Sequence, residues 1–356
     1  MSYPDTTQVT ADVPGLTVPD SWMFAHPTRV ADFFVAYSEK ILHPGRTLKP
    51  IKLNITVERG ETGRHLHGLR DVVKLAKNDP GAFVDSVDAP SDAVLFDVRS
   101  DTDRNPAHVM AMAAGILLAK RELSQNAGKD VVITAVVGAH PSNVIQSVLS
   151  LLGVPFIATD RNVRGRLIRE AHEIRYANLV PLIPRDFNFS FQGYRADTPK
   201  RVYFPRRGAR EVINDAEVSS FFEKRGFKTI SPEKLSVAEQ WSLARNAEVA
   251  AVVHGASWWS FHLSRAGLDA NPSDPTPLKM LDLFSPAFTL NSINTLATVL
   301  NGRYCSVRGQ ITPEILQALE FDAPEKEPSP LKPPAPWPFK VSIASLERAL
   351  DCLEVD

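Results

Sequence analysis

The fold class is decided by residues 130–159, DVVITAVVGAHPSNVIQSVLSLLGVPFIAT. A valine-rich apolar run is followed by a turn of small residues, an amphipathic stretch and a second short apolar run. This order predicts a strand, a helix and another strand. Just upstream, DAVLFDV (92–98) predicts a buried strand, and residues 107–123, preceded by Pro106, predict a long helix. Strands that alternate with helices favour an α/β fold with a parallel sheet.

The second half of the chain repeats this pattern. RVYFPRR (201–207) predicts a strand that ends in arginines, and residues 213–226 predict a helix that Gly226 stops. Ser236, with Glu239 three residues later, predicts a capped helix start. EVAAVV (248–253) and LKMLDLFSP (278–286) predict further buried strands. A proline-rich stretch follows at 323–339, and residues 341–355 predict an amphipathic helix that docks on the body.

The composition of the chain argues against several classes of binding partner. The 356 residues include 40 basic and 41 acidic side chains, so no overall field favours nucleic acid or an anionic membrane. Cys305 and Cys352 are the only cysteines, too few for a disulfide framework or a cysteine-based zinc site. The polar N-terminal residues and the lack of a long apolar run lead us to expect a cytoplasmic protein. Such a protein can still associate peripherally with the inner membrane.

A histidine and a glycine end the predicted strand EVAAVV. Ligands of open parallel sheets bind outside the carboxyl ends of the strands, where His254, Gly255 and Ala256 are expected to lie. Gly255 would let a phosphate approach the backbone, and a helix that begins at Ser257 would present its positive end to the anion. The alternative is a tight turn beside a histidine with satisfied hydrogen bonds.

A second loop of the same half favours the anion-binding interpretation. The strand RVYFPRR leads into a loop whose guanidinium groups suit bidentate phosphate recognition. The arginines concerned are Arg206, Arg207 and Arg210. Each of them alone is also compatible with a solvated charge run, but two anion-favouring loops at one sheet edge point to a binding site.

Four motifs then follow one another with a recognisable spacing. They are RRGAREVINDAE (206–217), GFKTISPEKLSVAEQ (226–240), AEVAAVVHGA (247–256) and LDLFSP (281–286). As a set they resemble glycosyltransferase family 61, which includes bacterial capsular and exopolysaccharide transferases. An N-x-x-H element of the family also has its counterpart in the first half, at Asn105 and His108.

The resemblance implies a fold and a reaction. The fold is GT-B-like, with two Rossmann-like lobes whose parallel sheets face a cleft. The expected segments are an acceptor-side lobe (1–180), a nucleotide-sugar-binding lobe (181–322) and a proline-rich linker with a C-terminal helix (323–356). The implied reaction is an inverting transfer from a nucleotide-sugar, a UDP-sugar in our interpretation, to a glycan or lipid-linked glycan acceptor. It needs no metal and no other cofactor, and the protein can join a polysaccharide assembly complex.

The resemblance also assigns roles to individual residues. His108 is the expected catalytic base or acceptor-orienting residue, and the alternative for it is a residue that simply lies at a helix start. Asp282 is expected to contact the ribose or the sugar. The expected binders of the nucleotide-sugar are Arg206, Arg207, Arg210, His254, Gly255 and Ala256, and the expected supporting residues are Asn105, Asn214, Glu217 and Gln240.

Other readings of the sequence stay open. Trp258 and Trp259 follow the HGA turn where the family continues differently, which leaves room for a nucleotide-binding protein without catalysis. At least one of the two tryptophans is expected in the core. A nucleotide-sugar epimerase is a third possibility, although no G-x-G-x-x-G loop is present. A metal pair at Asp101 and Asp103, or at His65 and His67, is the less favoured interpretation of those residues.

Overall fold

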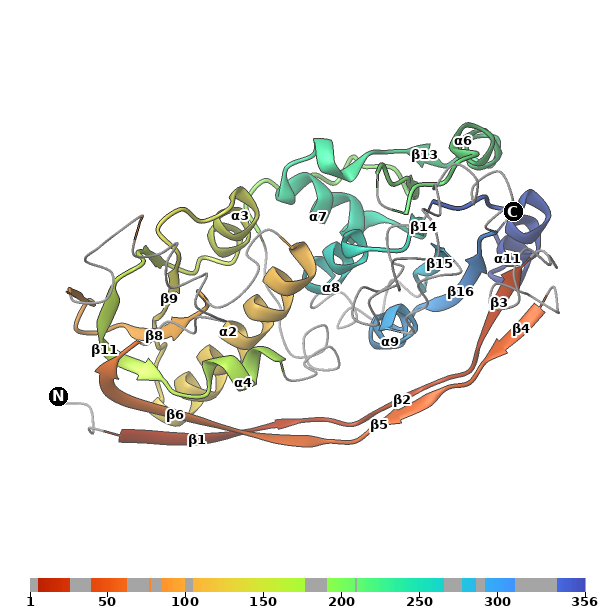
Figure 1. Cartoon of the computed structure of the whole chain (residues 1–356). Coiled ribbons are helices and arrows are strands. Elements are labelled where there is room, and N and C mark those ends of the chain that lie inside the picture. Colours follow the sequence, from red (N-terminus) through yellow and green to blue (C-terminus); the bar gives the residue numbers. More distant parts are fainter. Residues whose placement is uncertain are drawn as a thin grey trace, which may run out of the picture. The chain divides into compact units, whose positions relative to one another are not determined.

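The computed structural model (Figure 1) describes residues 6–25, 40–62, 77, 85–99, 105–176, 191–208, 210–265, 277–285, 292–310 and 338–355. The chain forms two compact units. Unit 1 consists of Met1–Gly15 and Lys49–Gln192, and unit 2 of Leu16–Leu48 and Gly193–Asp356. The longer segment of the second unit begins at Gly193, and a segment close to the N-terminus belongs to the same unit.

Unit 1 is built on a mixed sheet in the order β1-β6-β11-β8-β9-β10, with β7 also paired to β11. Its strands are β1 (Thr6–Val13), β6 (Ile51–Glu61), β7 (Ser86–Asp88), β8 (Val94–Asp97), β9 (Ile133–Val137), β10 (Phe156–Ala158) and β11 (Asn162–Ile168). Strands β11, β8, β9 and β10 run parallel, whereas β6 is antiparallel to both β1 and β11. The parallel part contains the strands predicted from residues 92–98 and 130–159.

The described part of unit 1 contains the helices α2 (Pro106–Ala127), α3 (Asn143–Leu151) and α4 (Ala171–Tyr176). Two of them, α2 and α3, begin after a capping side chain. The Asn105 side chain accepts a hydrogen bond from the Ala107 amide at 3.0 Å, with Pro106 in the first turn. Gly128, at φ 62°, ends α2 in the left-handed conformation that glycine adopts without strain. Helix α2 packs against both α3 and α4.

Unit 2 contains a sheet in the order β13-β12-β14-β15-β16-β3-β4 and a separate pair, β2-β5. The strands are β2 (Leu16–Val18), β3 (Ser21–Ala25), β4 (Lys40–His43), β5 (Arg46–Leu48), β12 (Arg201–Phe204), β13 (Lys228–Thr229), β14 (Val249–Val253), β15 (Lys279–Phe284) and β16 (Arg303–Arg308). All neighbours in the large sheet are parallel except β3 and β4. Together the two units confirm the predicted α/β class with parallel sheets.

Helices cover both faces of this sheet. They are α6 (Asp215–Glu223), α7 (Val237–Asn246), α8 (Ser260–Ser264), α9 (Ser292–Val299) and α11 (Ile343–Cys352), with the 3-10 helices η3 (Pro232–Lys234) and η4 (Ala256–Trp259). The main core lies on the face that α6 and α11 cover, where Phe222 and Leu346 pack with Leu281 of β15. On the opposite face, Phe204 of β12 contacts Phe261 of α8. The predicted capping box of α7, Ser236 with Glu239, is confirmed.

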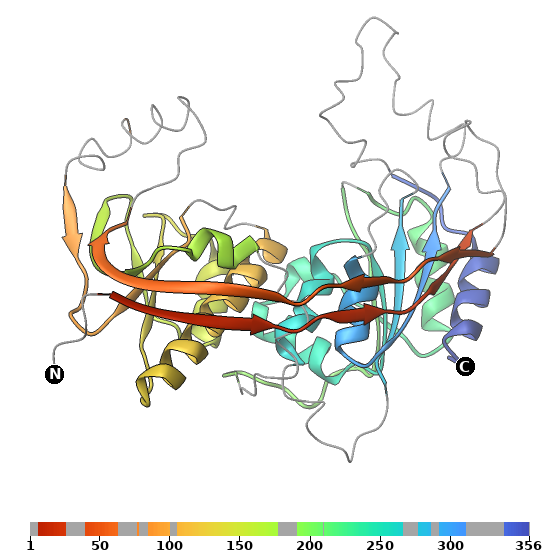
Figure 2. The same cartoon turned by 90° about the horizontal axis from the view of Figure 1, so that it is seen from below.

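One antiparallel ribbon near the N-terminus contributes strands to both units. Its two arms run side by side through β1 with β6, β2 with β5 and β3 with β4 (Figure 2). The register is the same throughout, because Val13 pairs with Ile51, Leu16 with Leu48 and Ser21 with His43. In unit 2 the ribbon extends the parallel sheet beyond β16. No sequence pattern indicated that β3 and β4 join the second sheet.

The C-terminal segment holds the loop that follows β12. The Phe339 amide donates to the Glu211 carbonyl, and the Ile213 amide donates to the Phe339 carbonyl, at 3.0 and 2.9 Å. The Phe339 ring is fully buried and fills the space above Gly309, where any Cβ would overlap it. Burying such a ring stabilises the fold by roughly 1.5–3 kcal/mol. The segment after the proline-rich stretch therefore docks on unit 2, as expected for residues 341–355.

Among the helices in the described part of the chain, none combines the length and the apolar character that crossing a bilayer requires.

Candidate functional site

The strand order of unit 2 defines where a ligand is expected. Seen across the sheet, the strands from β12 to β16 follow in the order β13-β12-β14-β15-β16. The chain therefore passes from β12 to β13 on one side and then to β14 on the other side, so the direction of strand addition reverses between β12 and β14. In open α/β sheets, ligands bind at such a switch point, outside the carboxyl ends of the strands. The loop after β12 carries the clustered arginines, and the turn after β14 is His254-Gly255-Ala256. The two anion-favouring loops predicted from the sequence therefore meet at one place.

Four side chains lie in one cross-strand row at this edge. Phe284 of β15 pairs with Arg308 of β16. Continuing the register of β14 and β15 by one residue sets His254 beside Phe284, and their rings are 6.4 Å apart between centroids. The Arg206 guanidinium donates to the His254 carbonyl at 3.1 Å, which places Arg206 next in line. We call Arg206, His254, Phe284 and Arg308 the edge row.

Below the edge row, Asp282 is the centre of a buried hydrogen-bond network. Its carboxylate is fully buried and accepts from His254 Nδ1 at 2.7 Å, from Trp258 Nε1 at 2.9 Å and from the Tyr304 hydroxyl at 3.3 Å. Burial, reinforced by the Asp282 charge, raises the pKa of Tyr304 well above its ordinary value, so this hydroxyl keeps its proton. Three donors satisfy the buried charge, and the His254 ring is fixed with Nδ1 as the donor.

The burial of Asp282 bears on the role that was predicted for its side chain. From the sequence, we expected the Asp282 carboxylate to contact the ribose or the sugar. In this structure the side chain has no exposed surface. Its carboxylate is directed at His254, Trp258 and Tyr304. Trp258 is likewise buried and committed to the network, in line with the expectation that one tryptophan belongs to the core.

The absence of a side chain at Gly255 makes room for Arg206. The backbone of Gly255 is extended, with φ 170°, so no strain requires glycine there. A Cβ at this position would overlap the terminal nitrogen of Arg206. The sequence expectation was that Gly255 admits a phosphate to the backbone and that a helix begins at Ser257. In the structure the space holds a guanidinium, and the short 3-10 helix η4 begins at Ala256.

Arg210 lies in the same loop, and both its backbone conformation and the surroundings of its charge are unfavourable. Its φ of 63° is in the left-handed region, which residues other than glycine rarely adopt. Burial and the like charge of Arg206 lower its pKa to about 10, although Asp282 acts in the opposite direction. Burial also lowers the pKa of Arg206. Two half-buried guanidinium groups thus lie close together, an arrangement that an anion between them would stabilise.

Replacing Arg210 by glycine is expected to stabilise the ligand-free protein. The folded state binds the Arg210 proton less tightly than the unfolded state does, so at neutral pH the charged side chain opposes folding. Glycine also removes the left-handed strain, worth ~1 kcal/mol. We expect Tm to rise by about 2–4 °C, and Arg210→Lys, which keeps charge and backbone strain, to stay near wild type. A lower Tm for Arg210→Gly in calorimetry would contradict this account.

The remaining predicted residues of unit 2 hold the loops together. Asn214 donates to Glu217 and to the Val341 carbonyl, at 2.8 and 2.9 Å, and accepts from the Val341 amide. It therefore ties the arginine loop to the C-terminal segment. Gln240 donates to the carbonyls of Pro232 and Leu235.

The other two predicted binders of unit 2 differ in their surroundings. Arg207 is exposed, and its charge acts on Tyr203 of β12, which belongs to the opposite face of the sheet. Ala256 lies at the start of η4, directly after Gly255.

In unit 1, Asn105 and His108 both lie at the start of α2. Asn105 is the N-cap, and His108 is a partly buried residue of the first turn. The predicted acidic pair Asp101 and Asp103 and the pair His65 and His67 lie outside the described residues. Across the described ranges, no three histidine, cysteine or acidic side chains gather in a metal-binding group.

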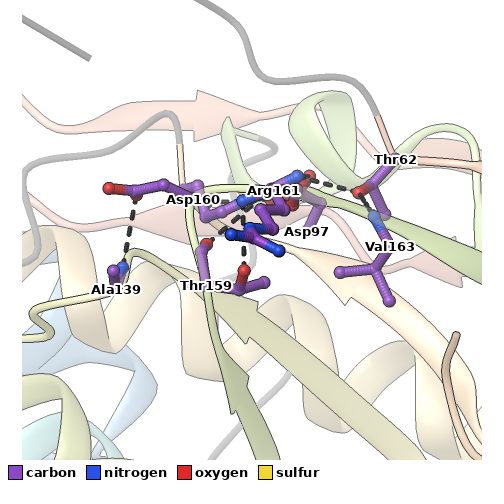
Figure 3. A network of polar contacts seen from close by, with 8 residues as sticks. Thr62, Asp97, Ala139, Thr159, Asp160, Arg161 and Val163 are labelled. Carbon is purple, nitrogen blue, oxygen red and sulfur yellow. Dashed lines mark hydrogen bonds and ion pairs between the residues drawn. The ribbon is translucent and has the colours of Figure 1, made fainter. Parts of the chain in front are cut away.

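A second polar network lies at the carboxyl end of β8 (Figure 3). Arg99 is paired with Asp97 and donates to the carbonyls of Thr159 and Arg161 and to the Thr62 hydroxyl. All five guanidinium N–H groups are used in this way. Figure 3 shows Thr62 also bonded to Val163, and Asp160 bonded to the amide of Ala139. Arg99 therefore clamps loops of its own unit and has no donor left for a ligand.

Sequence reasoning missed two residues of the candidate site, Tyr304 and Arg308, because the strand β16 was not predicted. One signal was available. The segment Val307-Arg308-Gly309 repeats the pattern of Val253-His254-Gly255, a strand that ends in a basic residue followed by glycine.

The comparison with known families agrees with this geometry. The match to a family model places this α/β protein in the class of glycosyltransferases. The model that matches is that of Glycosyltransferase 61; it covers residues 128–261 of the chain, and this confirms the resemblance drawn from the motifs. The matched segment includes the arginine loop, Gln240 and the HGA turn, whereas Asn105, His108 and Asp282 lie outside it. No curated protein sequence matches the chain.

Proposed function

We propose that this glycosyltransferase uses a nucleotide-sugar, in particular a UDP-sugar, and that the edge row of unit 2 binds its diphosphate. The observation that carries the proposal is the pair of half-buried arginines, Arg206 and Arg210, beside His254 at the switch point of the sheet. Guanidinium groups bind phosphate oxygens in charge-assisted pairs. The acceptor is a glycan or a lipid-linked glycan, and the product extends a bacterial surface polysaccharide.

The proposed reaction is an inverting transfer in a GT-B arrangement. An acceptor hydroxyl oxygen forms a bond to the anomeric carbon while the bond from that carbon to the diphosphate oxygen breaks. The hydroxyl proton passes to a base, and the electron pair of the broken bond leaves with the nucleoside diphosphate. Negative charge therefore grows on the diphosphate in the transition state. Fixed positive groups at that position lower the barrier without any metal.

His254 supplies one of these groups in the proposal. Its Nδ1 is held by Asp282, so the ring orientation is fixed before a ligand binds. In the protonated ring, Nε2–H is a second donor, and the buried carboxylate compensates the imidazolium charge. His254 then donates a hydrogen bond to the departing diphosphate, with Arg206 and Arg210 on the same side. Phe284 lies beside the ring and limits its movement.

His108 of unit 1 remains our proposed base for the acceptor hydroxyl. It lies in the first turn of α2, at the carboxyl end of β8, which corresponds to the ligand-binding edge of the sheet of unit 1.

The proposal is tested by a thermal-shift screen with UDP, GDP, TDP, CMP and the corresponding sugars. A ligand at 100 times its Kd adds about 2.7 kcal/mol to the stability of the folded state. Tm should therefore rise by about 5–10 °C with one of the diphosphates. The shift should be lost in Arg206→Gln and kept in His108→Ala, which should in turn abolish transfer from the nucleotide-sugar that the screen selects.

The outcomes separate the competing functions. A shift without any transfer or donor hydrolysis in the wild type would favour the nucleotide-binding protein without catalysis. Interconversion of one nucleotide-sugar into another without an acceptor would favour the epimerase. No shift with any of these nucleotides would contradict the proposed donor site.

A further inference from the structure

Arg308 is the last residue of β16 and the far member of the edge row. Side chains two residues apart in a strand lie on the same face, so Arg308 shares its face with Ser306 and Tyr304. Tyr304 is bonded to Asp282, which also holds His254. Arg308 therefore belongs to the same face and the same carboxyl edge as the proposed diphosphate site.

The half-buried Arg308 differs from the buried Arg99 in its hydrogen-bond partners. Its Nε is buried, and no hydrogen-bond partner for it is found within the described ranges. Arg99, by comparison, uses every donor within the chain. At the other end of β16, Arg303 forms an ion pair with Glu354 at 2.5 Å. A half-buried guanidinium with an unused donor is unfavourable unless an anion binds to it.

Among the residues that the structure describes, no carboxylate compensates the charge of Arg308. Burial lowers the pKa of Arg308, and no acidic group of the described chain acts against this. Burial and the Arg308 charge together lower the pKa of His43 on β4, so this histidine favours its neutral form. The acidic side chain on the same face, Asp282, is already occupied by three donors.

We propose that Arg308 is a further anion-binding residue of the donor site, and that it binds a phosphate or a sugar carboxylate of the nucleotide-sugar. This inference rests on the proposed function. Neighbouring strands are about 4.8 Å apart, so β16 lies roughly 10 Å from β14 along the edge. A ligand held by Arg206 and His254 at one end and by Arg308 at the other lies along the edge row and over Phe284. The carboxylate of a uronic acid and the phosphate next to the sugar are the two groups that fit this place.

The test is calorimetric titration of wild type, Arg308→Gln and the matched control Arg303→Gln. The probes are inorganic pyrophosphate, UDP, UDP-glucose and UDP-glucuronate. If Arg308 binds a phosphate, Arg308→Gln weakens pyrophosphate and UDP by about 10-fold or more, and Arg303→Gln stays within about 2-fold. If it binds a sugar carboxylate, UDP is unchanged, and the preference for UDP-glucuronate over UDP-glucose falls by about 10-fold. Arg308→Gln should melt no lower than wild type, because it removes a half-buried charge for which the described part of the chain supplies no carboxylate.

Two results would overturn the inference, and they differ in what else they affect. If the wild type binds these probes and Arg308→Gln binds each of them equally well, only the role of Arg308 is excluded. If the wild type binds neither pyrophosphate nor any nucleotide of the set, the inference and the proposed donor site fail together.

Discussion

Replacing Asp282 by alanine is expected to lower the free energy of unfolding by about 3–5 kcal/mol, the usual loss when one partner of a buried charged network is removed. Three buried donors, on His254, Trp258 and Tyr304, would lose their acceptor together. For units of this size the loss corresponds to a Tm lower by about 6–20 °C. Denaturant unfolding of the ligand-free protein measures it directly.

Two milder variants calibrate the effect. Tyr304→Phe removes only the longest of the three bonds and is expected to lower stability by about 1 kcal/mol. Asp282→Asn keeps the shape but replaces one acceptor oxygen by a donor, so it should lose nucleotide affinity and activity more than stability. A loss below about 1 kcal/mol for Asp282→Ala would show that the network does not hold the ring of His254 in place.

The second large effect is expected from Gly255→Ala. The new methyl group would occupy the position of the terminal Arg206 nitrogen and break its bond to the His254 carbonyl. The guanidinium is the end of a flexible side chain, so it can move into solvent and the fold should survive. A charge-assisted hydrogen bond contributes about 1.5–3 kcal/mol. Affinity for the nucleoside diphosphate should therefore fall by about 10–100-fold, with Tm of the ligand-free protein within about 2 °C of wild type.

Gly138 provides a matched control in unit 1. It directly follows β9 and begins the corresponding strand-to-helix turn, and a Cβ there would make only an ordinary contact with Asp160. Gly138→Ala should therefore leave both stability and nucleotide affinity unchanged. Equal affinities of Gly255→Ala and wild type in calorimetric titration would mean that Arg206 does not bind the diphosphate from the observed position.

Local sequence patterns predicted much of the fold. The apolar runs at 92–98 and 248–253 became buried strands, and Ser236 with Glu239 capped its helix as expected, because these features depend on neighbouring residues alone. The N-terminal ribbon could not be placed in this way. Its strand β3 pairs with β16, almost the whole chain away, and no local pattern encodes such a pairing.

The candidate site was predictable only to the level of its loops. The arginines and the HGA turn were recognisable because strand ends of one parallel sheet lie at one edge. The role of Asp282 depended on burial by Trp258 and Tyr304, which no spacing reveals. Arg308 was missed because its position in the edge row follows from the strand order, and β16 stands two strands away from the HGA turn.

The central claim is that the donor diphosphate binds at the carboxyl edge of the sheet of unit 2. The most direct measurement is a crystal structure of the protein with the nucleoside diphosphate that the screen selects. The account predicts phosphate oxygens within hydrogen-bond distance of the guanidinium groups of Arg206 and Arg210 and of His254 Nε2. A diphosphate bound instead at the carboxyl edge of unit 1, beside His108, would contradict it.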